Sequence, residues 1–388
     1  MHSGKNVFAQ LMAWIHPEQF RRCVVRYRGD YKVLSFSCWE QFLAMAFAQI
    51  TYRESLADLE VCLRSRPDQL YHMGFRSVVA HSTLADANRT RDWRIYADLA
   101  QRLISRARPL YAQDPLGVEL AQTIYALDST TIDLCLSLFP WARFRSTKAA
   151  VKLHTLLDVR GPIPTMIAIS DGKQADVRAL DELIPEAGAF YVMDRGYLDF
   201  ERLYRFVLAG AFFVTRTKAG VQLNRLESRP VDRTTGIRSD HIVWLRSVHS
   251  VRHYPDRLRR VAYRDPEDGK VLIFLTNNFD LPAIVIAQLY KLRWRVELFF
   301  KWIKQNLRIK HFFGTSDNAV RTQVWIAICV YVLAAIVRKE LRLDLTLSQI
   351  LQVLSVNAFE HVPLLQLFAH TRSQAESSYS PNQLMLWG

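Results

Sequence analysis

The sequence predicts a mixed α/β protein with helical segments toward both ends of the chain. From the N-terminus to about residue 115, apolar residues recur at three- and four-residue intervals, as they do in amphipathic helices. From Gln122 the pattern changes to short apolar runs that are rich in β-branched and aromatic residues and bounded by turn formers, which is typical of strands. Helical periodicity returns after residue 277 and predicts long helices there.

Residues 1–115 are expected to form a small helical domain. The stretch FSCWEQFLAMAFAQITYRESLADLEVCLRS has a helical period that a proline then breaks, and Ser82 or Thr83 is a candidate N-cap for LADANRTRDW. RIYADLAQRLISRA continues as another helix. Small helical bundles of this kind can place a helix in the major groove of DNA. The alternative is a helical cap whose charges are solvated.

Residues 116–215 are expected to form the first part of an α/β domain. Five strand-like runs, TIYALDSTTIDL, VKLHTLLDV, PTMIAIS, AFYVMDRGY and AFFVTRT, are interrupted by two segments of helical period. These are ADVRALDELIP before the fourth run and DFERLYRFVLAG before the fifth. Three strands, helix, strand, helix, strand is the order of a ribonuclease H-like layer.

Residues 216–276 are too long for a plain loop and contain three short strand candidates, so we expect a β-rich insertion. Residues 277–340 would complete the α/β domain with one long helix, LPAIVIAQLYKLRWRVELFFKWIKQNL, and with RTQVWIAICVYVLAAIV packed behind it. The apolar stretch at 324–337 is shorter than the roughly 20 residues of a spanning helix, which favours a buried helix. Residues 341–388 would add a last amphipathic helix and a polar tail.

The amino-acid composition and the net charge favour some classes of function over others. The 388 residues are 50% hydrophobic, which is enough for a large core. A net charge of +14 favours a polyanionic partner such as nucleic acid, although proteins of membrane surfaces share this basic character. The five cysteines have no CxxC or CxxH pairing, so neither a disulfide framework nor a zinc site is indicated. The first residues lack a secretory pattern, and we expect a cytoplasmic protein.

Two strand-like runs end in an aspartate, at Asp128 and at Asp194. A carboxylate where a buried strand emerges from the core is well placed to bind a metal ion. A strand-end aspartate that caps a turn is the alternative for any single position, and Asp158 fits the same description. A third carboxylate, Glu297, lies in the long predicted helix beside an apolar arc.

On that helix, Glu297 shares one stripe with Tyr290, Arg293 and Lys304, a pattern that a solvated charged face would also produce. The spacing of these four residues resembles the Tyr-Arg-Glu-Lys signature of bacterial DDE transposases of the insertion sequence 4 family. The DST sequence at Asp128 and the DRGY sequence at 194–197 resemble the first and second aspartate motifs of that family.

The resemblance implies that Asp128, Asp194 and Glu297 are catalytic and hold two Mg²⁺ ions, with Mn²⁺ as a substitute and Asp128 as the bridge. Mg²⁺ prefers oxygen ligands, so three carboxylates suffice without histidine or cysteine. A pair of such ions can activate the attacking oxygen and neutralise the leaving oxygen of a phosphodiester. The tyrosine, arginine and lysine of the signature would contact DNA phosphates.

Further DNA contacts are expected from bases that flank the two aspartates and from an aromatic residue of the insertion. The insertion offers Trp244, Tyr254 and Tyr263 as stacking faces for a flipped base, of which Trp244 is the largest, although a core position in its strand is the alternative. The flanking bases are Arg195, Arg145, Lys148 and Lys152.

The function that the resemblance implies is cut-and-paste transposition by a homodimer that cleaves the terminal inverted repeats of a transposon and joins them to target DNA. A hairpin intermediate at the transposon end is the expected route, because family members with a β-rich insertion can form one. Two alternatives stay open: a related metal-dependent DNA nuclease, and a non-catalytic DNA-binding protein derived from a transposase. The presence of all three carboxylates argues against the second.

Overall fold

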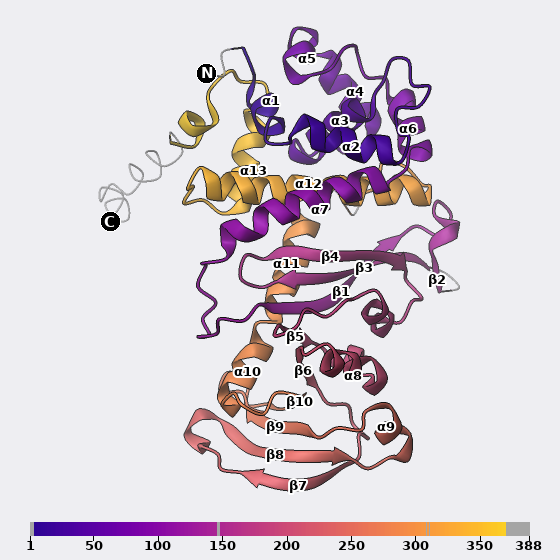
Figure 1. Ribbon diagram of the computed structural model, residues 1–388. Helices are drawn as coiled ribbons and strands as arrows, with labels where there is room; N and C mark the ends of the chain where they lie inside the picture. Colours follow the sequence, from indigo (N-terminus) through magenta and orange to yellow (C-terminus); the bar gives the residue numbers. More distant parts are fainter. Residues whose placement is uncertain (1–3, 146–147, 308, 310, 370–388) are drawn as a thin grey trace, which may run out of the picture. The chain divides into compact units, whose positions relative to one another are not determined.

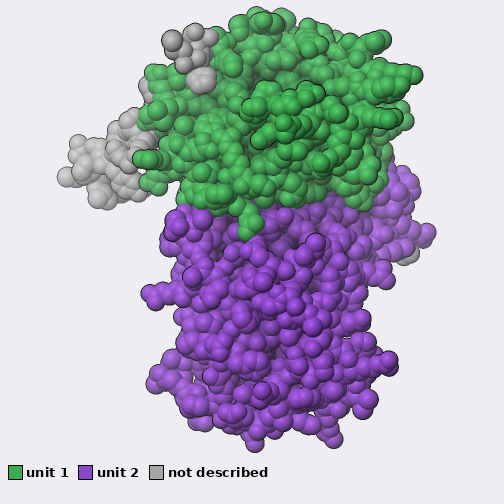
Figure 2. All heavy atoms as spheres, in the orientation of Figure 1, with its two compact units in different colours: residues 1–110, 302–388 green, residues 111–301 purple. Residues whose placement is uncertain are grey.

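The computed structural model describes residues 4–369 except 146, 147, 308 and 310. Figure 2 colours its two compact units, of which the first comprises residues 1–110 and 302–388 and the second residues 111–301. This division differs from the expected one, because residues 302–340 were assigned to the α/β domain and instead group with the N-terminal helices.

The first unit is helical and is built around two apolar helices, α3 and α12, which pack against each other. A capping box at Ser37 and Glu40 fixes the start of α3, and all but one of its residues are buried. α6 starts at His81, one residue before the expected N-cap positions Ser82 and Thr83, so that prediction is wrong. The helices are α1 (Val7–Met12), α2 (Pro17–Arg26), α3 (Cys38–Ile50), α4 (Leu56–Arg64), α5 (Pro67–Met73), α6 (His81–Thr90), α7 (Arg94–Tyr111), α12 (Asp317–Glu340) and α13 (Leu347–Val356).

α12 explains why the C-terminal residues join the first unit. Its 24 residues are long and apolar enough to cross a membrane, yet 94% of its most apolar window is buried. It packs against α3, α6 and α13, as a core helix does. The buried helix expected at 324–337 is therefore confirmed, with all of these residues at most 2% exposed except Trp325 at 4%. Its apolar surface on all sides requires cover from the N-terminal helices.

The second unit is organised on one mixed sheet, seen in Figure 1. β3 pairs antiparallel with β1 on one edge and with β2 and β4 on the other. β1, β5 and β6 run parallel, and β10, β9, β8 and β7 extend the sheet as antiparallel neighbours. The strands are β1 (Ile124–Leu134), β2 (Arg143–Arg145), β3 (Lys148–Asp158), β4 (Ile163–Asp171), β5 (Phe190–Met193), β6 (Phe212–Arg216), β7 (Leu223–Arg229), β8 (Ile237–Leu245), β9 (Leu258–Arg264) and β10 (Val271–Thr276).

The helical segments of the second unit differ from expectation at one place. α8 (Phe200–Leu208) forms as predicted and buries Leu203 and Phe206 in a core with Phe213 and Leu275. The segment ADVRALDELIP forms only a short 3-10 helix, η2 (Asp176–Asp181), where an α-helix was expected. Pro185 offers a reason, because a proline disfavours helical backbone in the residue before it.

The segment 216–276 contains β7, β8, β9 and β10, together with a short helix, α9 (Val248–His253), that the sequence pattern did not indicate. These strands continue the central sheet, because β10 pairs with β6 at Phe274 and Arg216. Sheet hydrogen bonds therefore join this segment to the strands that precede it.

The long helix expected before residue 307 is broken into α10 (Ala283–Lys291) and α11 (Trp294–Asn306). At the break the amide of Arg293 donates to the Tyr290 carbonyl at 3.1 Å, and the amide of Val296 donates to the Arg293 carbonyl at 3.1 Å. These bonds span three residues instead of four, so they tighten the turn and change the direction in which the side chains point. The expectation of one continuous helix from 290 to 304 is wrong.

Candidate active site

The parallel pairing of β1 with β5 brings the two predicted aspartates together. Leu127 pairs with Met193, so Asp128 and Asp194 are the next residues on neighbouring strands. β5 ends at Met193, and Asp194 begins the short 3-10 helix η3 (Arg195–Tyr197). β1 instead continues to Leu134, so Asp128 lies within a strand and not at its end as expected.

Arg293 joins Asp128 to Glu297. Its Nη1 lies 2.6 Å from Asp128 Oδ2, and its Nη2 lies 2.6 Å from Glu297 Oε1. The side chains of Asp128 and Arg293 are 19% and 17% exposed, and that of Glu297 is 32% exposed, so the cluster is partly shielded from water. Charge-assisted bonds of this length are among the strong hydrogen bonds in proteins.

Tyr290 reaches the remaining carboxylate. Its hydroxyl donates to Asp194 Oδ1 at 3.1 Å. Its ring is buried and packs on Phe274 with centroids 4.7 Å apart, and the Arg293 guanidinium lies 5.7 Å from the ring centroid. Because Tyr290 lies in the last turn of α10 and Arg293 lies in the break before α11, the two side chains contact different aspartates.

The electrostatics of the cluster link the three carboxyl groups. The pKa of Asp128 is raised to about 6, mainly by burial and also by the charges of Glu297 and Asp194, against the opposing effects of the Ser129 amide and Arg293. Burial likewise raises the pKa of Tyr290 to about 12, so its hydroxyl stays protonated and available as a donor at neutral pH. The pKa of Asp128 therefore depends on the charges of both other carboxylates of the cluster.

The donor chemistry fits a divalent cation. Three carboxylates supply the hard oxygen ligands that Mg²⁺ or Mn²⁺ takes, and the Arg293 guanidinium is a stand-in cation between two of them. Across the described ranges, no three His, Cys, Asp or Glu side chains already converge closely enough to hold one ion.

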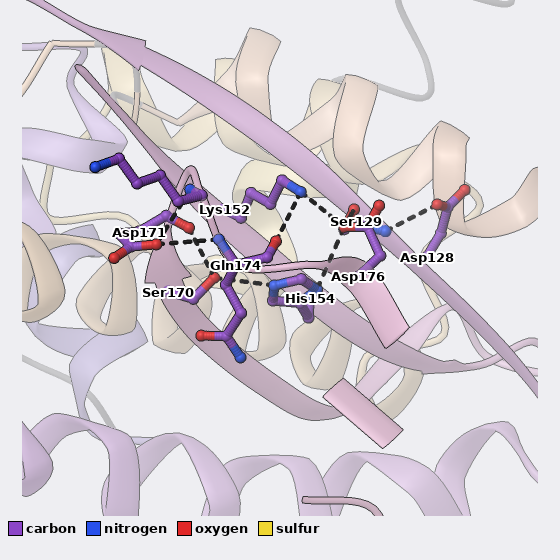
Figure 3. A network of polar contacts seen from close by, with 9 residues as sticks. Asp128, Ser129, Lys152, His154, Ser170, Asp171, Gln174 and Asp176 are labelled. Atoms are coloured by element: carbon purple, nitrogen blue, oxygen red, sulfur yellow. Dashed lines mark hydrogen bonds and ion pairs between the residues drawn. The ribbon is translucent and has the colours of Figure 1, made fainter. Parts of the chain in front are cut away.

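A second polar network lies next to Asp128 on β1 and β3 (Figure 3). Ser129 Oγ donates to Asp176 Oδ1 at 2.7 Å, and Lys152 Nζ donates to the same oxygen at 3.0 Å. Although burial raises the pKa of Asp176, the hydrogen bonds from Ser129 and Lys152 hold it below its ordinary value. His154, which is buried on β3, shares a 3.0 Å hydrogen bond with Ser170 through Nε2.

This network changes the interpretation of Lys152, which was predicted to contact DNA. Its side chain is only 15% exposed and is committed to an internal ion pair. In this structure the half-buried lysine supports β1 through its ion pair with Asp176, and its contact with DNA stays a prediction. Asp176 was missed by sequence reasoning, because nothing in ADVRALD distinguishes it from an ordinary surface aspartate.

The other predicted DNA contacts differ in exposure and in the elements that carry them. Arg195 and Lys148 are exposed, Arg195 directly after Asp194 and Lys148 at the start of β3. The side chain of Arg145, at the end of β2, lies outside the described part of the structure. Lys304 is partly buried in the last turn of α11 and belongs to the helical unit.

The three aromatic candidates of the insertion differ in exposure. Trp244 is partly exposed on β8, while its neighbours Val243 and Leu245 point into the core. Tyr254 and Tyr263 are 0% and 5% exposed, so neither can stack on a base in this structure. Among these three residues, Trp244 alone is exposed enough to meet a base in this structure, and its contact with DNA stays a prediction.

Comparisons with known proteins indicate the family of this chain. Residues 119–333 match the family described as a transposase DDE domain, and residues 3–76 match a domain of unknown function (DUF4372). A Sinorhizobium fredii protein named as a transposase, y4zB, is 34% identical over 65% of this chain and 70% of the relative. A Geobacillus stearothermophilus protein named as the transposase of insertion sequence element IS5377 is 30% identical over 65% of this chain and 66% of the relative.

Among solved structures, the piggyBac transposase in a synaptic complex with hairpin DNA has a TM-score of 0.44 at 10% identity, covering 97% of this chain and 83% of that chain. A TM-score and a sequence identity this low are not evidence for the function of this chain. The family match spans both aspartates and the glutamate of the cluster. The chain therefore belongs to the DDE transposases of bacterial insertion sequences, DNA-binding enzymes that depend on divalent metal ions to cut and transfer DNA.

Proposed function

We propose that Asp128, Asp194 and Glu297 are the catalytic, metal-binding carboxylates of a cut-and-paste transposase of the insertion sequence 4 family. The observation that carries this proposal is the clustering of three carboxylates from separate stretches of sequence around Arg293 and Tyr290. The strand order β4, β3, β1, β5, β6, with β1 and β5 supplying the two aspartates, supports a ribonuclease H-like catalytic domain.

The metal is proposed to be Mg²⁺, with Mn²⁺ as a substitute, because all three ligands are hard oxygens. When bound, such ions supply an activated oxygen nucleophile and a neutralised leaving oxygen. The residues of this chain orient the ligands: Tyr290 holds one oxygen of Asp194, and the Ser129 amide donates to Asp128 Oδ1 at 2.8 Å. Partial burial of Asp128 and Glu297 limits the access of bulk water.

The DNA partner is proposed to be the transposon end with its terminal inverted repeat, followed by target DNA. Tyr290, Arg293 and Lys304 would contact phosphates near the scissile bond, Arg293 as a fork and Lys304 as a point charge. The exposed Arg195 and Lys148 would extend this contact along the backbone. The N-terminal helices would bind the transposon end, and two copies of the chain would act together in the cytoplasm as a homodimer.

Second-strand cleavage is proposed to follow a hairpin route. The partly exposed Trp244 would stack on a base that leaves the duplex, which offsets the few kcal/mol that unstacking costs. With Mg²⁺ and a labelled transposon end, we expect a product that denatures as one covalently closed strand. If time courses show both strands cut by water without this species, the hairpin route is wrong even where the carboxylate assignment holds.

The carboxylate assignment is tested by Asp128→Asn, Asp194→Asn and Glu297→Gln. Each variant should lose strand cleavage in Mg²⁺ and keep nearly full binding to the transposon end, because it removes a metal ligand and not a phosphate contact. Binding is measured by electrophoretic mobility shift and cleavage on a labelled duplex. Normal cleavage by any one of the three variants would refute the assignment of that residue.

A further inference from the structure

Every carboxylate of the candidate active site already has a partner in the structure. Asp128 Oδ2 accepts from Arg293 at 2.6 Å, and its Oδ1 accepts from the Ser129 amide at 2.8 Å. Glu297 Oε1 lies 2.6 Å from Arg293 Nη2, and Asp194 Oδ1 accepts from Tyr290 at 3.1 Å. One guanidinium thus neutralises charge on two of the three carboxylates.

The bonds of Arg293 differ from those of a purely structural arginine in the same unit. Arg259 is 1% exposed and uses all three of its side-chain nitrogens, on Asp240 and on the carbonyls of Asn278 and Leu281. Arg293 is 17% exposed, and its Nε is buried and finds no hydrogen-bond partner in the described part of the chain. Its side-chain hydrogen bonds in the described part of the chain go to Asp128 and Glu297 and leave one donor unsatisfied, so it is held less completely.

From these contacts we infer that Arg293 is a displaceable counter-cation, which occupies the metal position between Asp128 and Glu297 and must leave before a divalent cation can bind. The inference rests on the proposed assignment of these carboxylates as metal ligands. A guanidinium that lies 2.6 Å from both groups stands where an ion shared by these two carboxylates would lie, so the two cations cannot occupy that position together. The displaced guanidinium keeps its full charge and its planar fork, which suits a phosphate oxygen pair.

The consequence is a thermodynamic coupling between the binding of metal and the binding of DNA. If DNA phosphate draws Arg293 away from the carboxylates, DNA strengthens metal binding, and by thermodynamic reciprocity metal strengthens DNA binding by the same factor. Without DNA the arginine competes for the site, so the free protein should bind metal weakly. This arrangement would limit metal-dependent cleavage to the DNA-bound protein.

The experiment measures Mn²⁺ affinity by electron paramagnetic resonance on the full chain without DNA. Arg293→Gln removes the competing charge, and we expect it to bind Mn²⁺ at least about tenfold more tightly than the natural protein. Arg293→Lys keeps the charge but lacks the fork that bridges two carboxylates, so an intermediate affinity is expected. Adding a duplex with the element's terminal sequence should tighten Mn²⁺ binding by the natural protein and much less by Arg293→Gln.

Arg202→Gln is the matched control, because Arg202 also bridges two carboxylates in the same unit, Asp181 at 2.8 Å and 2.8 Å and Asp199 at 3.0 Å. Its Mn²⁺ affinity should equal that of the natural protein. A thermal melt confirms that each variant is folded. Equal or weaker Mn²⁺ binding by folded Arg293→Gln, or no binding by either protein, would overturn the inference.

The assignment of Asp128 and Glu297 as metal ligands can be refuted independently of the role of Arg293. If Asp128→Asn and Glu297→Gln bind Mn²⁺ as tightly as the natural protein, these residues are not the ligands, and the proposed function is wrong at its base. If both variants lose Mn²⁺ binding while Arg293→Gln shows no gain, the ligands are right and only the role of Arg293 is refuted.

Discussion

The ion pair between Arg259 and Asp240 offers a test of what holds the extended sheet together. The two side chains are 1% and 3% exposed, and they come from diagonal positions on the neighbouring strands β8 and β9. Arg259 Nε and Nη2 donate to the Asp240 carboxylate at 2.9 Å and 2.7 Å, and Nη1 donates to the Leu281 carbonyl at 2.6 Å. Leu281 lies in the loop before α10, so this arginine also positions the helix that carries Tyr290.

Arg259→Met should destabilise this part of the unit by about 3–5 kcal/mol, because it leaves a buried carboxylate without its main partner. The nearest remaining cation is Arg229, whose Nε is 4.0 Å from Asp240 Oδ2, at the limit of an ion pair. The Leu281 carbonyl also loses its donor. A second variant, Arg259→Met with Asp240→Leu, removes the uncompensated charge and should recover most of the loss.

The assay is amide hydrogen exchange on β8 and β9, which reports the local free energy of opening, combined with the urea midpoint of the whole chain. The single variant should lose protection in these strands, and the double variant should regain it. A single-variant cost below about 1 kcal/mol, as for a surface ion pair, would refute the reasoning. So would a double variant that is as unstable as the single one, because the cost would then not come from the unpaired carboxylate.

Three further predictions concern the site and its surroundings. Tyr290→Phe keeps the buried ring but removes the hydroxyl that donates to Asp194. Single-turnover cleavage should therefore slow by about tenfold or more, while thermal stability changes little. An unchanged rate would show that this hydrogen bond does not matter for cleavage. Lys304→Ala should weaken binding to the transposon end and lower the slope of log K against log salt by about 1, whereas an unchanged slope would place Lys304 away from the phosphates. The pKa of Asp176 is lower in the folded chain than its ordinary value of 3.8, so its stabilising contribution is present above that value and is lost as the pH falls through the folded pKa. Lys152→Met removes one cause of the lowered pKa, so its thermal stability should fall less steeply below about pH 4 than that of the natural protein; identical acid profiles would contradict this role for Lys152.

The identity of the candidate site residues could be predicted from sequence because their chemistry and spacing are local features. Asp128 and Asp194 follow apolar runs that form adjacent parallel strands, and Glu297 lies in a stretch with a clear apolar arc. The change from helical periodicity to strand-like runs near residue 122 likewise predicted where the sheet starts, with β1 beginning at Ile124. These features depend on the order of apolar and polar residues, and the chain keeps that order wherever it folds.

Only the tertiary structure decided which side chains meet. The break at Arg293 turns Tyr290 toward one aspartate and Arg293 toward the other, and no periodicity in the sequence indicated it. Lys152 is a basic residue of the kind that contacts DNA phosphates. However, β3 places it against Asp176, which comes from a separate 3-10 helix. The strands of the insertion extend the central sheet, because β10 pairs antiparallel with β6. Such pairings depend on long-range packing and on burial of charge, and those energies arise only when distant segments come together.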